Sequence, residues 1–178
     1  VVQALQECSA VKLVNVFPDN PSKNLQTISG NYLLMDGTTG APIVIMDAGE
    51  LTARRTAAAS ALASSYLSRK DSKKLLIVGS GRLAGCLGFA HGAVRDLTEI
   101  KVWARNPAKA EIIAEVYQKA GKAAEVAVNL EKACGWADII SCATMSSDPL
   151  VLGKWLQPGV HIDLIGGFKP TLRETDDE

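Results

Sequence analysis

The chain has 178 residues, of which 47% are hydrophobic and 21% are charged, so it can bury one full hydrophobic core and part of a second. Its 19 acidic and 19 basic side chains cancel. The overall charge therefore gives no reason to expect a nucleic acid or an anionic membrane as partner, and the expected ligand is a small molecule.

The apolar runs are too short to span a membrane, and the first residues lack the basic region and cleavage signature of a secretory signal. We therefore expect a cytoplasmic protein with no membrane partner. The cysteines show no C-x-x-C spacing and no neighbouring histidine pattern, so we expect reduced, mostly buried thiols and neither a metal site nor a disulfide framework. They are Cys8, Cys86, Cys134 and Cys142.

Alternation of apolar and polar residues predicts three strands in the N-terminal part of the chain, over residues 11–16, 31–35 and 42–46. The turn residues at 36–40 are expected to join the last two strands into a β-hairpin. Residues 18–24 are rich in proline, asparagine and serine. They predict a loop, which could carry function or only connect two strands.

Residues 51–67 are rich in alanine and predict a single helix, with Thr52 as its N-cap. After a polar break at residues 71–72, predicted strands alternate with helices. This alternation is typical of an α/β protein with a parallel, doubly wound sheet of the Rossmann type. The expected strands cover residues 75–78, 100–104, 126–128, 139–142 and 161–165. Three helices are expected: one after the first strand, one that begins at Pro107, and one around residues 130–136.

Right-handed crossovers would place four loops at one edge of this sheet, where α/β proteins bind their ligands. They are the loops after Val78, Ala104, Cys142 and Ile165. His91 falls in the first of these helices and His161 in the last strand. We expect both to be packed or partly exposed histidines without a catalytic role.

The most informative segment is the strand expected at residues 74–78, KLLIV, which leads directly into the glycine-rich sequence GSGRLA. In a dinucleotide-binding turn, Gly79 permits the tight turn, Gly81 lets the backbone approach the pyrophosphate, and Ala84 allows the helix to pack on the strand. The phosphates would meet the N–H groups at the start of the helix. The alternative is a turn that only packs helix on sheet. The candidate cofactor-binding residues are Gly79, Ser80, Gly81, Arg82 and Leu83.

The residue that follows the second strand distinguishes the two nicotinamide cofactors, because an acidic side chain there would bind the ribose hydroxyl and repel a phosphate. This sequence has Arg105 followed by Asn106. A guanidinium pairs bidentately with phosphate and an amide adds a hydrogen bond, so we expect NADP(H) to be preferred, with NAD(H) possible. The alternative for Arg105 is a solvated side chain at a strand end.

The loops after the next two strands should border the nicotinamide half of the site. Thr144 lies in the first loop, and Gly166, Gly167 and Phe168 form the second. Thr144 is a candidate for a hydrogen bond to the cofactor, or it caps the turn that follows.

Four segments of the chain resemble the ornithine cyclodeaminase and μ-crystallin family: residues 12–15, residues 51–58, the glycine turn and residues 166–174. The RTAA sequence before the turn is more specific than the turn alone, and the order of the four segments is that of the family. The resemblance extends through nearly the whole chain.

The resemblance implies a nucleotide domain and a smaller α+β substrate and dimerisation domain made by both chain ends. Residues 1–50 would be part of the smaller domain, residues 51–70 a connecting helix, and residues 71–178 a Rossmann domain that is incomplete at its C-terminus. The chain is then expected to be a portion of a longer protein that forms a homodimer.

The resemblance also implies that Lys12 and Arg55 bind the substrate carboxylate, that Lys12 takes part in proton transfer, and that Thr56 contacts the cofactor. The chemistry agrees, because a guanidinium holds a carboxylate bidentately and a desolvated lysine can act as a general acid. Without the resemblance, Lys12 would be interpreted as a solvated strand lysine and Arg55 as a helix-surface charge.

Two positions depart from the family pattern. Phe168 stands where cyclodeaminases have an aspartate that activates water or accepts a proton, and a phenyl ring can do neither. Leu83 stands where glutamine is common, although its backbone N–H could still face the phosphates. The first departure makes cyclodeamination less expected.

We therefore expect an NADPH-dependent reductase of a cyclic α-imino acid of the pyrroline- or piperideine-2-carboxylate type. One alternative is an ornithine cyclodeaminase, which forms proline and ammonia with NAD. Another is a non-catalytic NADPH-binding protein, as μ-crystallin exemplifies within the family.

Overall fold

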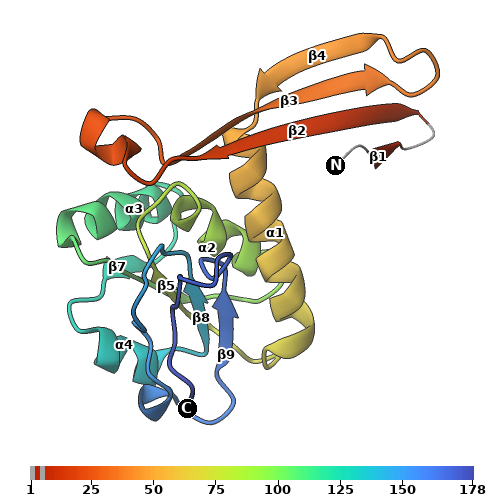
Figure 1. Ribbon diagram of the computed structural model, residues 1–178. Coiled ribbons are helices and arrows are strands. Elements are labelled where there is room, and N and C mark those ends of the chain that lie inside the picture. The colour runs from red at the N-terminus through yellow and green to blue at the C-terminus, as the bar shows by residue number, and fades with distance from the viewer. Residues whose placement is uncertain (1–2, 5–6) are drawn as a thin grey trace. The chain divides into compact units, whose positions relative to one another are not determined.

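The computed structural model describes residues 3–4 and 7–178, and the chain divides into two compact units, residues 1–53 and 54–178 (Figure 1). Each unit is described separately below. In the part of the chain that the structure describes, no helix is both long and apolar enough to cross a membrane.

The first unit is built on a four-stranded antiparallel sheet in the order β1-β2-β3-β4. The two long central strands pair along their whole length, from Cys8 opposite Asp36 to Val16 opposite Ile28. The predicted strands and the β3–β4 hairpin are therefore confirmed, and the predicted loop 18–24 contains a short 3₁₀ helix, η1. The elements are β1 (Gln3–Ala4), β2 (Cys8–Val16), η1 (Asn20–Lys23), β3 (Ile28–Asp36) and β4 (Pro42–Asp47).

The hairpin turn is held by the Asp36 carboxylate. One of its oxygens accepts hydrogen bonds from the backbone N–H groups of Thr38 and Thr39 and from the Thr39 hydroxyl, at 2.7 to 3.0 Å. These donors favour the ionised form, so the pKa of Asp36 lies below its usual value. This Asx-type turn fixes the register of the two strands.

Helix α1 (Gly49–Leu67) starts in the first unit and continues into the second. Its start is stabilised by Asp47, whose Oδ1 accepts from the Gly49 N–H at 2.8 Å. The prediction that Thr52 is the N-cap is therefore wrong, because a carboxylate satisfies the helix start one turn earlier. Thr52 lies inside the first turn, and its Oγ1 is 3.4 Å from Lys12 Nζ.

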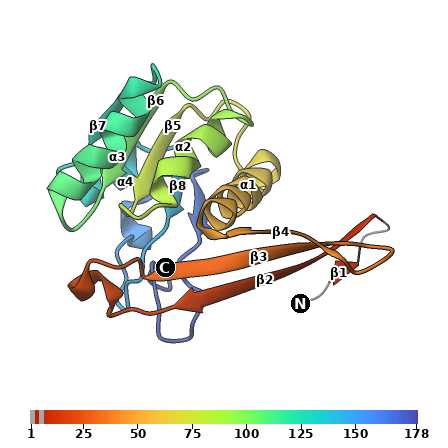
Figure 2. The same cartoon turned by 90° about the horizontal axis from the view of Figure 1, so that it is seen from above.

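The second unit has a five-stranded parallel sheet in the order β7-β6-β5-β8-β9. Helices α2 and α3 lie side by side on one face of this sheet (Figure 2), and α4 packs on the other. The predicted Rossmann-type, doubly wound sheet is confirmed. Its elements are β5 (Lys74–Val78), α2 (Ala84–Gly92), β6 (Glu99–Trp103), α3 (Pro107–Lys119), β7 (Ala124–Val126), α4 (Leu130–Trp136), β8 (Ile139–Cys142), η2 (Gly153–Trp155) and β9 (His161–Leu164).

The strand predicted at residues 126–128 is two residues out of place. Ala124 to Val126 pair with β6, so β7 ends where the prediction begins. Val128 is 95% exposed. Two β-branched residues favour a strand at this point, but the pairing with β6 decides its position.

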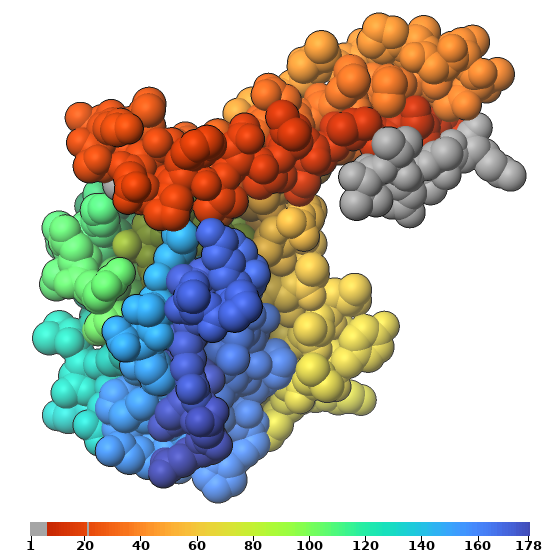
Figure 3. Space-filling view, in the orientation of Figure 1, coloured from red at the N-terminus to blue at the C-terminus, as the bar shows by residue number. Residues whose placement is uncertain are grey.

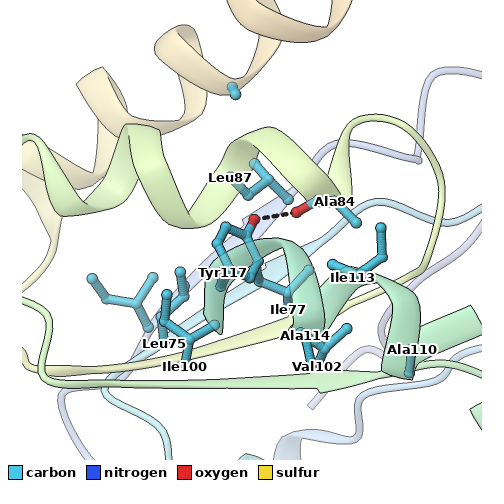
Figure 4. Packing of buried hydrophobic residues seen from close by; sticks show 12 residues of the cluster. Leu75, Ile77, Ala84, Leu87, Ile100, Val102, Ala110, Ile113, Ala114 and Tyr117 are labelled. Carbon is cyan, nitrogen blue, oxygen red and sulfur yellow. Dashed lines mark hydrogen bonds between the residues drawn. The ribbon is translucent and has the colours of Figure 1, made fainter. Parts of the chain in front are cut away.

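Two hydrophobic clusters cover the two faces of the sheet. The first joins the alternate strand residues Leu75 and Ile77 to helices α1, α2 and α3, and Figure 4 shows its centre around Tyr117. The second joins Leu76 and Val78 to α4. Because residues 75–78 of β5 are buried on both faces, they form an uninterrupted apolar run.

The C-terminal segment lies along the residues that follow β8. Leu150 and Val151 donate their N–H groups to the Glu174 carbonyl, and Arg173 donates to the Ser146 carbonyl. In Figure 3 this dark blue segment crosses the surface of the second unit beside lighter blue residues. The contact brings Glu174 to the edge of the sheet where β8 ends.

Candidate functional site

The glycine turn links the end of β5 to the start of α2, at the edge where the parallel strands end. Gly79 has φ of +133°, and its N–H donates to the Trp103 carbonyl at 2.8 Å. A Cβ atom at Gly79 would lie 2.5 Å from the carbonyl oxygen of Ala143. Only glycine meets both conditions, because it tolerates this backbone conformation and leaves room for the loop after β8.

Gly81 differs from Gly79, because nothing within the protein requires a glycine there. A Cβ at Gly81 would meet no atom of the described residues within 4 Å, and its φ is not positive. The residue is exposed. Open space beside a glycine at the start of a helix is what a phosphate needs to approach the backbone closely. The turn therefore fits a dinucleotide pyrophosphate.

Helical winding begins inside this turn. The N–H groups of Ala84 and Cys86 donate to the carbonyls of Gly81 and Leu83 at 3.0 and 2.9 Å. The backbone of Leu83 is helical, with φ of −61° and ψ of −39°, and no side chain caps it. Its own side chain packs against the first hydrophobic cluster. The N–H groups of residues 81–83 thus form the N-terminal end of the helix, where an α-helix has donors to offer an anion.

The side chains of the turn and of the next strand end are placed differently. Arg82 is exposed and Ser80 is half-buried. Arg105 follows β6 and is exposed, whereas Asn106 caps α3, with its Oδ1 accepting from the Ala108 N–H at 3.1 Å. The amide NH₂ of Asn106 is therefore the group that would donate to a ligand.

Thr144, in the loop after β8, makes contacts within the protein. Its N–H and its Oγ1 both donate to Oε1 of Glu174 at 2.7 Å, and its Oγ1 accepts from the Ser146 N–H at 3.4 Å. The hydrogen bond from the Ser146 N–H is the turn cap that the sequence offered as the alternative role of Thr144. The structure also brings Thr144 to the glycine turn, because its Cγ2 would lie 3.6 Å from a Cβ at Gly79.

Glu174 is a residue of this edge that sequence reasoning did not single out. Its side chain is buried, and besides Thr144 it accepts from the Gly166 N–H, through Oε2, at 2.8 Å. One carboxylate therefore joins the loops that follow β8 and β9. A Cβ at Gly166 would lie 2.0 Å from the Thr144 carbonyl oxygen, so the two loops meet only because residue 166 is glycine. The only sequence signal for Glu174 was its place in the segment that resembles the family.

The candidate substrate residues lie in both units. Lys12 is half-buried on β2, opposite Tyr32 of β3, and its Nζ contacts Thr52 as described above. Arg55 and Thr56 lie in the part of α1 that belongs to the second unit, with Arg55 exposed and Thr56 half-buried. Their roles remain predictions.

Phe168, in the loop after β9, is 51% exposed. The ammonium group of Lys169 lies 5.8 Å from the centre of its ring. This position therefore presents an apolar ring and a neighbouring cation, where an aspartate would present a proton acceptor.

A buried polar cluster lies beneath α1 and α2. Oδ2 of Asp163 accepts from the hydroxyls of Ser60 and Ser141, and it lies 3.9 Å from Nε2 of His91. Among the described residues, neither ring nitrogen of His91 has a hydrogen-bond partner. Burial lowers the pKa of His91 to about 4 and raises the pKa of Asp163. The prediction that His91 is a packed histidine is confirmed.

Acidification is expected to destabilise the fold through His91. In the unfolded chain this histidine binds a proton near pH 6.5, whereas the folded protein does so only near pH 4. The free energy of unfolding should therefore fall as the pH decreases from 6.5 to 4, by about 3 kcal/mol. Burial also lowers the pKa of His161, which adds to the loss, and the raised pKa of Asp163 opposes it.

Urea unfolding at pH 7 and pH 5 tests this expectation, with His91→Leu as the comparison. The variant should lose less stability than the wild type between the two pH values, because it no longer carries the buried imidazole. An equal loss in both proteins would show that His91 does not cause the pH dependence.

In the described ranges, 3–4 and 7–178, no group of three or more histidine, cysteine, aspartate or glutamate side chains is placed to hold a metal ion. Cys134 and Cys142 are buried and Cys8 and Cys86 partly buried. Burial raises the pKa of Cys134 to about 12, so this thiol is not a nucleophile at neutral pH.

Comparison with known proteins identifies the family of the chain. A model of the ornithine cyclodeaminase/mu-crystallin family matches residues 2–178, which confirms the resemblance. Delta(1)-pyrroline-2-carboxylate reductase of Paracoccus denitrificans is 42% identical over 169 residues, covering 93% of this chain and 53% of the relative. The chain thus spans about half the length of the curated relatives it matches.

Two solved structures share the fold along almost the whole chain. The structure of Thermococcus litoralis Delta(1)-pyrroline-2-carboxylate reductase, in complex with NADH and L-proline, is 32% identical with a TM-score of 0.89. The match covers 99% of this chain and 60% of that one. An archaeal alanine dehydrogenase dimer with bound NAD is also 32% identical with a TM-score of 0.89, covering 98% of this chain and 54% of its own.

Proposed function

The chain belongs to the ornithine cyclodeaminase/mu-crystallin family, and from this membership we propose that the full-length protein is a nicotinamide-dependent reductase of a cyclic α-imino acid. The observation that carries the proposal is the glycine turn. The backbone conformation and close contacts of Gly79 require a glycine, whereas no contact within the described residues requires a glycine at position 81. The reductase named for pyrroline-2-carboxylate, at 42% identity, supports the choice of substrate class.

The residues that would hold the nucleotide lie along one edge of the parallel sheet. Residues 79–83 would bind the pyrophosphate, and Arg105 and Asn106 would bind the adenosine ribose or its phosphate. Thr56 and Thr144 would contact the nicotinamide half. When bound, a reduced nicotinamide supplies the hydride for the C=N carbon.

The substrate would be held by its carboxylate. The Arg55 guanidinium is the bidentate partner, and the Lys12 ammonium adds a second positive charge and a proton. We propose that Lys12 protonates the imine nitrogen as the C=N bond is reduced. The hydrogen bond between Lys12 Nζ and Thr52 Oγ1 orients this ammonium group within its unit.

Phe168 favours reduction over cyclodeamination. A cyclodeaminase must deprotonate an amine or activate a water, which needs a base, and an aromatic ring has no acceptor for a proton. Reduction of an imine needs an acid at nitrogen, which Lys12 supplies. The apolar ring of Phe168 also suits the methylene groups of a cyclic imino acid.

Parallel assays distinguish the two reactions. The full-length protein should oxidise NADPH when pyrroline- or piperideine-2-carboxylate is added, and it should form no proline or ammonia from ornithine with NAD. Proline and ammonia from ornithine would identify a cyclodeaminase. Tight NADPH binding without turnover of any imino acid would identify a non-catalytic binding protein.

We further propose that Arg105 gives the site a preference for NADP(H). The solved relatives are described with NADH or NAD, so this preference rests on the exposed guanidinium at the end of β6. Arg105→Glu should reverse the ratio of the Kd values for NADPH and NADH, because a carboxylate repels the phosphate and accepts from the ribose hydroxyl.

The matched control for Arg105→Glu is Lys119→Glu, at the far end of α3. Both substitutions replace a positive charge with a negative one. The change in the ratio should be at least about tenfold for Arg105→Glu, which corresponds to about 1.4 kcal/mol. It should be absent for Lys119→Glu. An unchanged ratio in both variants would assign Arg105 to the solvated surface.

A further inference from the structure

The helix that follows the glycine turn is bound by a tyrosine from the neighbouring helix. Tyr117 of α3 is fully buried, and its hydroxyl accepts from the Gly88 N–H of α2 at 2.9 Å. The same hydroxyl donates to the Ala84 carbonyl, the contact drawn as a dashed line in Figure 4. The hydroxyl therefore bonds to the main chain at both ends of one helical turn, the first turn of α2.

The close approach depends on Gly88. A Cβ at this position would lie 2.7 Å from Cε1 and 2.8 Å from Cζ of Tyr117, and 3.0 Å from Cδ1 of Ile100. The φ of Gly88 is not positive, so the backbone conformation does not require glycine there. The missing side chain lets the tyrosine ring lie against the helix backbone.

Core packing alone does not explain this hydroxyl. The surrounding cluster is apolar and includes Leu75, Leu87 and Ile113, so a phenylalanine would fill the same space without burying a polar group. Burying an oxygen is favourable only where it finds partners. Its partners here are main-chain groups of the first turn of α2, the helix that follows residues 79–83. Burial also raises the pKa of Tyr117, so the hydroxyl stays a neutral donor.

We propose that Tyr117 is a positioning residue of the nucleotide site: it fixes the first turn of α2 and thereby the N–H groups of residues 81–83 that meet the pyrophosphate. The inference rests on the proposed function, because it assumes that the turn binds a dinucleotide. Its effect should appear in nucleotide affinity and should be the same for any ligand that carries the pyrophosphate.

The test variant is Tyr117→Phe, and the control is Tyr66→Phe. Tyr66 lies in α1 and is 81% exposed, so the control removes the same hydroxyl from a solvated side chain. The Kd values for NADPH and for ADP-ribose, which lacks the nicotinamide, are measured by calorimetry, with Tm measured in parallel. Tyr117→Phe should raise both Kd values by about two- to tenfold, the worth of one hydrogen bond. Tyr66→Phe should change neither Kd.

A second pair of variants tests the same geometry from the other helix. Gly88→Ala places a methyl group against the tyrosine ring and should also raise both Kd values. Gly85→Ala makes the same exchange in α2, where the nearest atom is 4.0 Å from the new Cβ, and it should leave them unchanged. If Tyr117→Phe does not fold, the Gly88 and Gly85 comparison decides.

The outcomes separate the inference from the proposed function. Suppose that the wild type binds NADPH and ADP-ribose and that Tyr117→Phe and Gly88→Ala bind them equally well, with only a lower Tm. The tyrosine then has a structural role alone, and the inference is overturned. If the wild type binds neither ligand, the proposed function itself fails.

Discussion

Replacing Lys12 with methionine is expected to lower kcat for reduction of a cyclic imino acid by about a hundred- to ten-thousandfold. This is the usual contribution of a positioned general acid. Methionine keeps most of the apolar stem of the half-buried lysine on β2 and removes the ammonium group that contacts Thr52. Loss of this charge should also raise the KM of the substrate, because a partner of its carboxylate disappears.

The matched control for Lys12→Met is Lys23→Met, since Lys23 is an exposed lysine of the same unit, in η1. Steady-state kinetics and NADPH binding are measured for both variants. The Lys12 variant should still bind NADPH with the affinity of the wild type, and the Lys23 variant should resemble the wild type throughout. If kcat of Lys12→Met stayed within about threefold of the wild type, Lys12 would not be the acid.

Replacing Gly79 with alanine is expected to abolish nucleotide binding and to destabilise the second unit. The new Cβ would have to occupy a backbone conformation with φ of +133° and would lie 2.5 Å from the Ala143 carbonyl oxygen. Relief of this contact would move the turn away from the loop after β8. We expect a loss of stability of about 2 to 4 kcal/mol and no measurable NADPH binding by calorimetry.

Gly81→Ala separates binding from folding. Its Cβ would meet no protein atom within 4 Å, so Tm should stay close to that of the wild type. The methyl group would nevertheless occupy the space that a pyrophosphate needs, and NADPH affinity should fall by at least about tenfold. If Gly81→Ala bound NADPH as tightly as the wild type, the turn would not be the pyrophosphate site. If Gly79→Ala were as stable as the wild type, the close approach to Ala143 would not matter.

The parts of the fold that could be predicted from sequence are those whose signal is local. Residues 75–78 of β5 are a continuous buried apolar run, and the glycine turn follows them directly. The hairpin of the first unit is marked by alternating strands and by the turn residues after Asp36. In each case the residues that decide the structure are neighbours in the chain.

The parts that were missed depend on residues far apart in the chain. Glu174 bonds to Thr144, thirty residues earlier, and Tyr117 bonds to Ala84, thirty-three residues earlier. Helical periodicity places Tyr117 on the buried face of α3. No local pattern marks the polar partners of Tyr117 or Glu174, because these contacts form only when distant parts of the chain fold together. The position of β7 was missed for a similar reason, since pairing with β6 overrides the local preference.

The candidate site also shows which features follow from local sequence and which depend on the folded chain. The sequence identified the glycine turn and the strand end at Arg105, because these positions follow from the order of strands in a doubly wound sheet. It could not reveal that Asn106 uses its side-chain oxygen to cap α3, or that the Thr144 hydroxyl bonds to a buried carboxylate. Both are competing uses of polar groups, and only the folded chain shows them.

The central claim, that this protein reduces a cyclic imino acid with a reduced nicotinamide, is tested most directly with NADPH that carries deuterium at the transferable position. The full-length protein is incubated with this nucleotide and pyrroline-2-carboxylate or piperideine-2-carboxylate, and the product is analysed by mass spectrometry. We expect proline or pipecolate with one deuterium at the carbon that carried the imine. Unlabelled product, or no amino acid at all while the nucleotide is bound, would contradict the account.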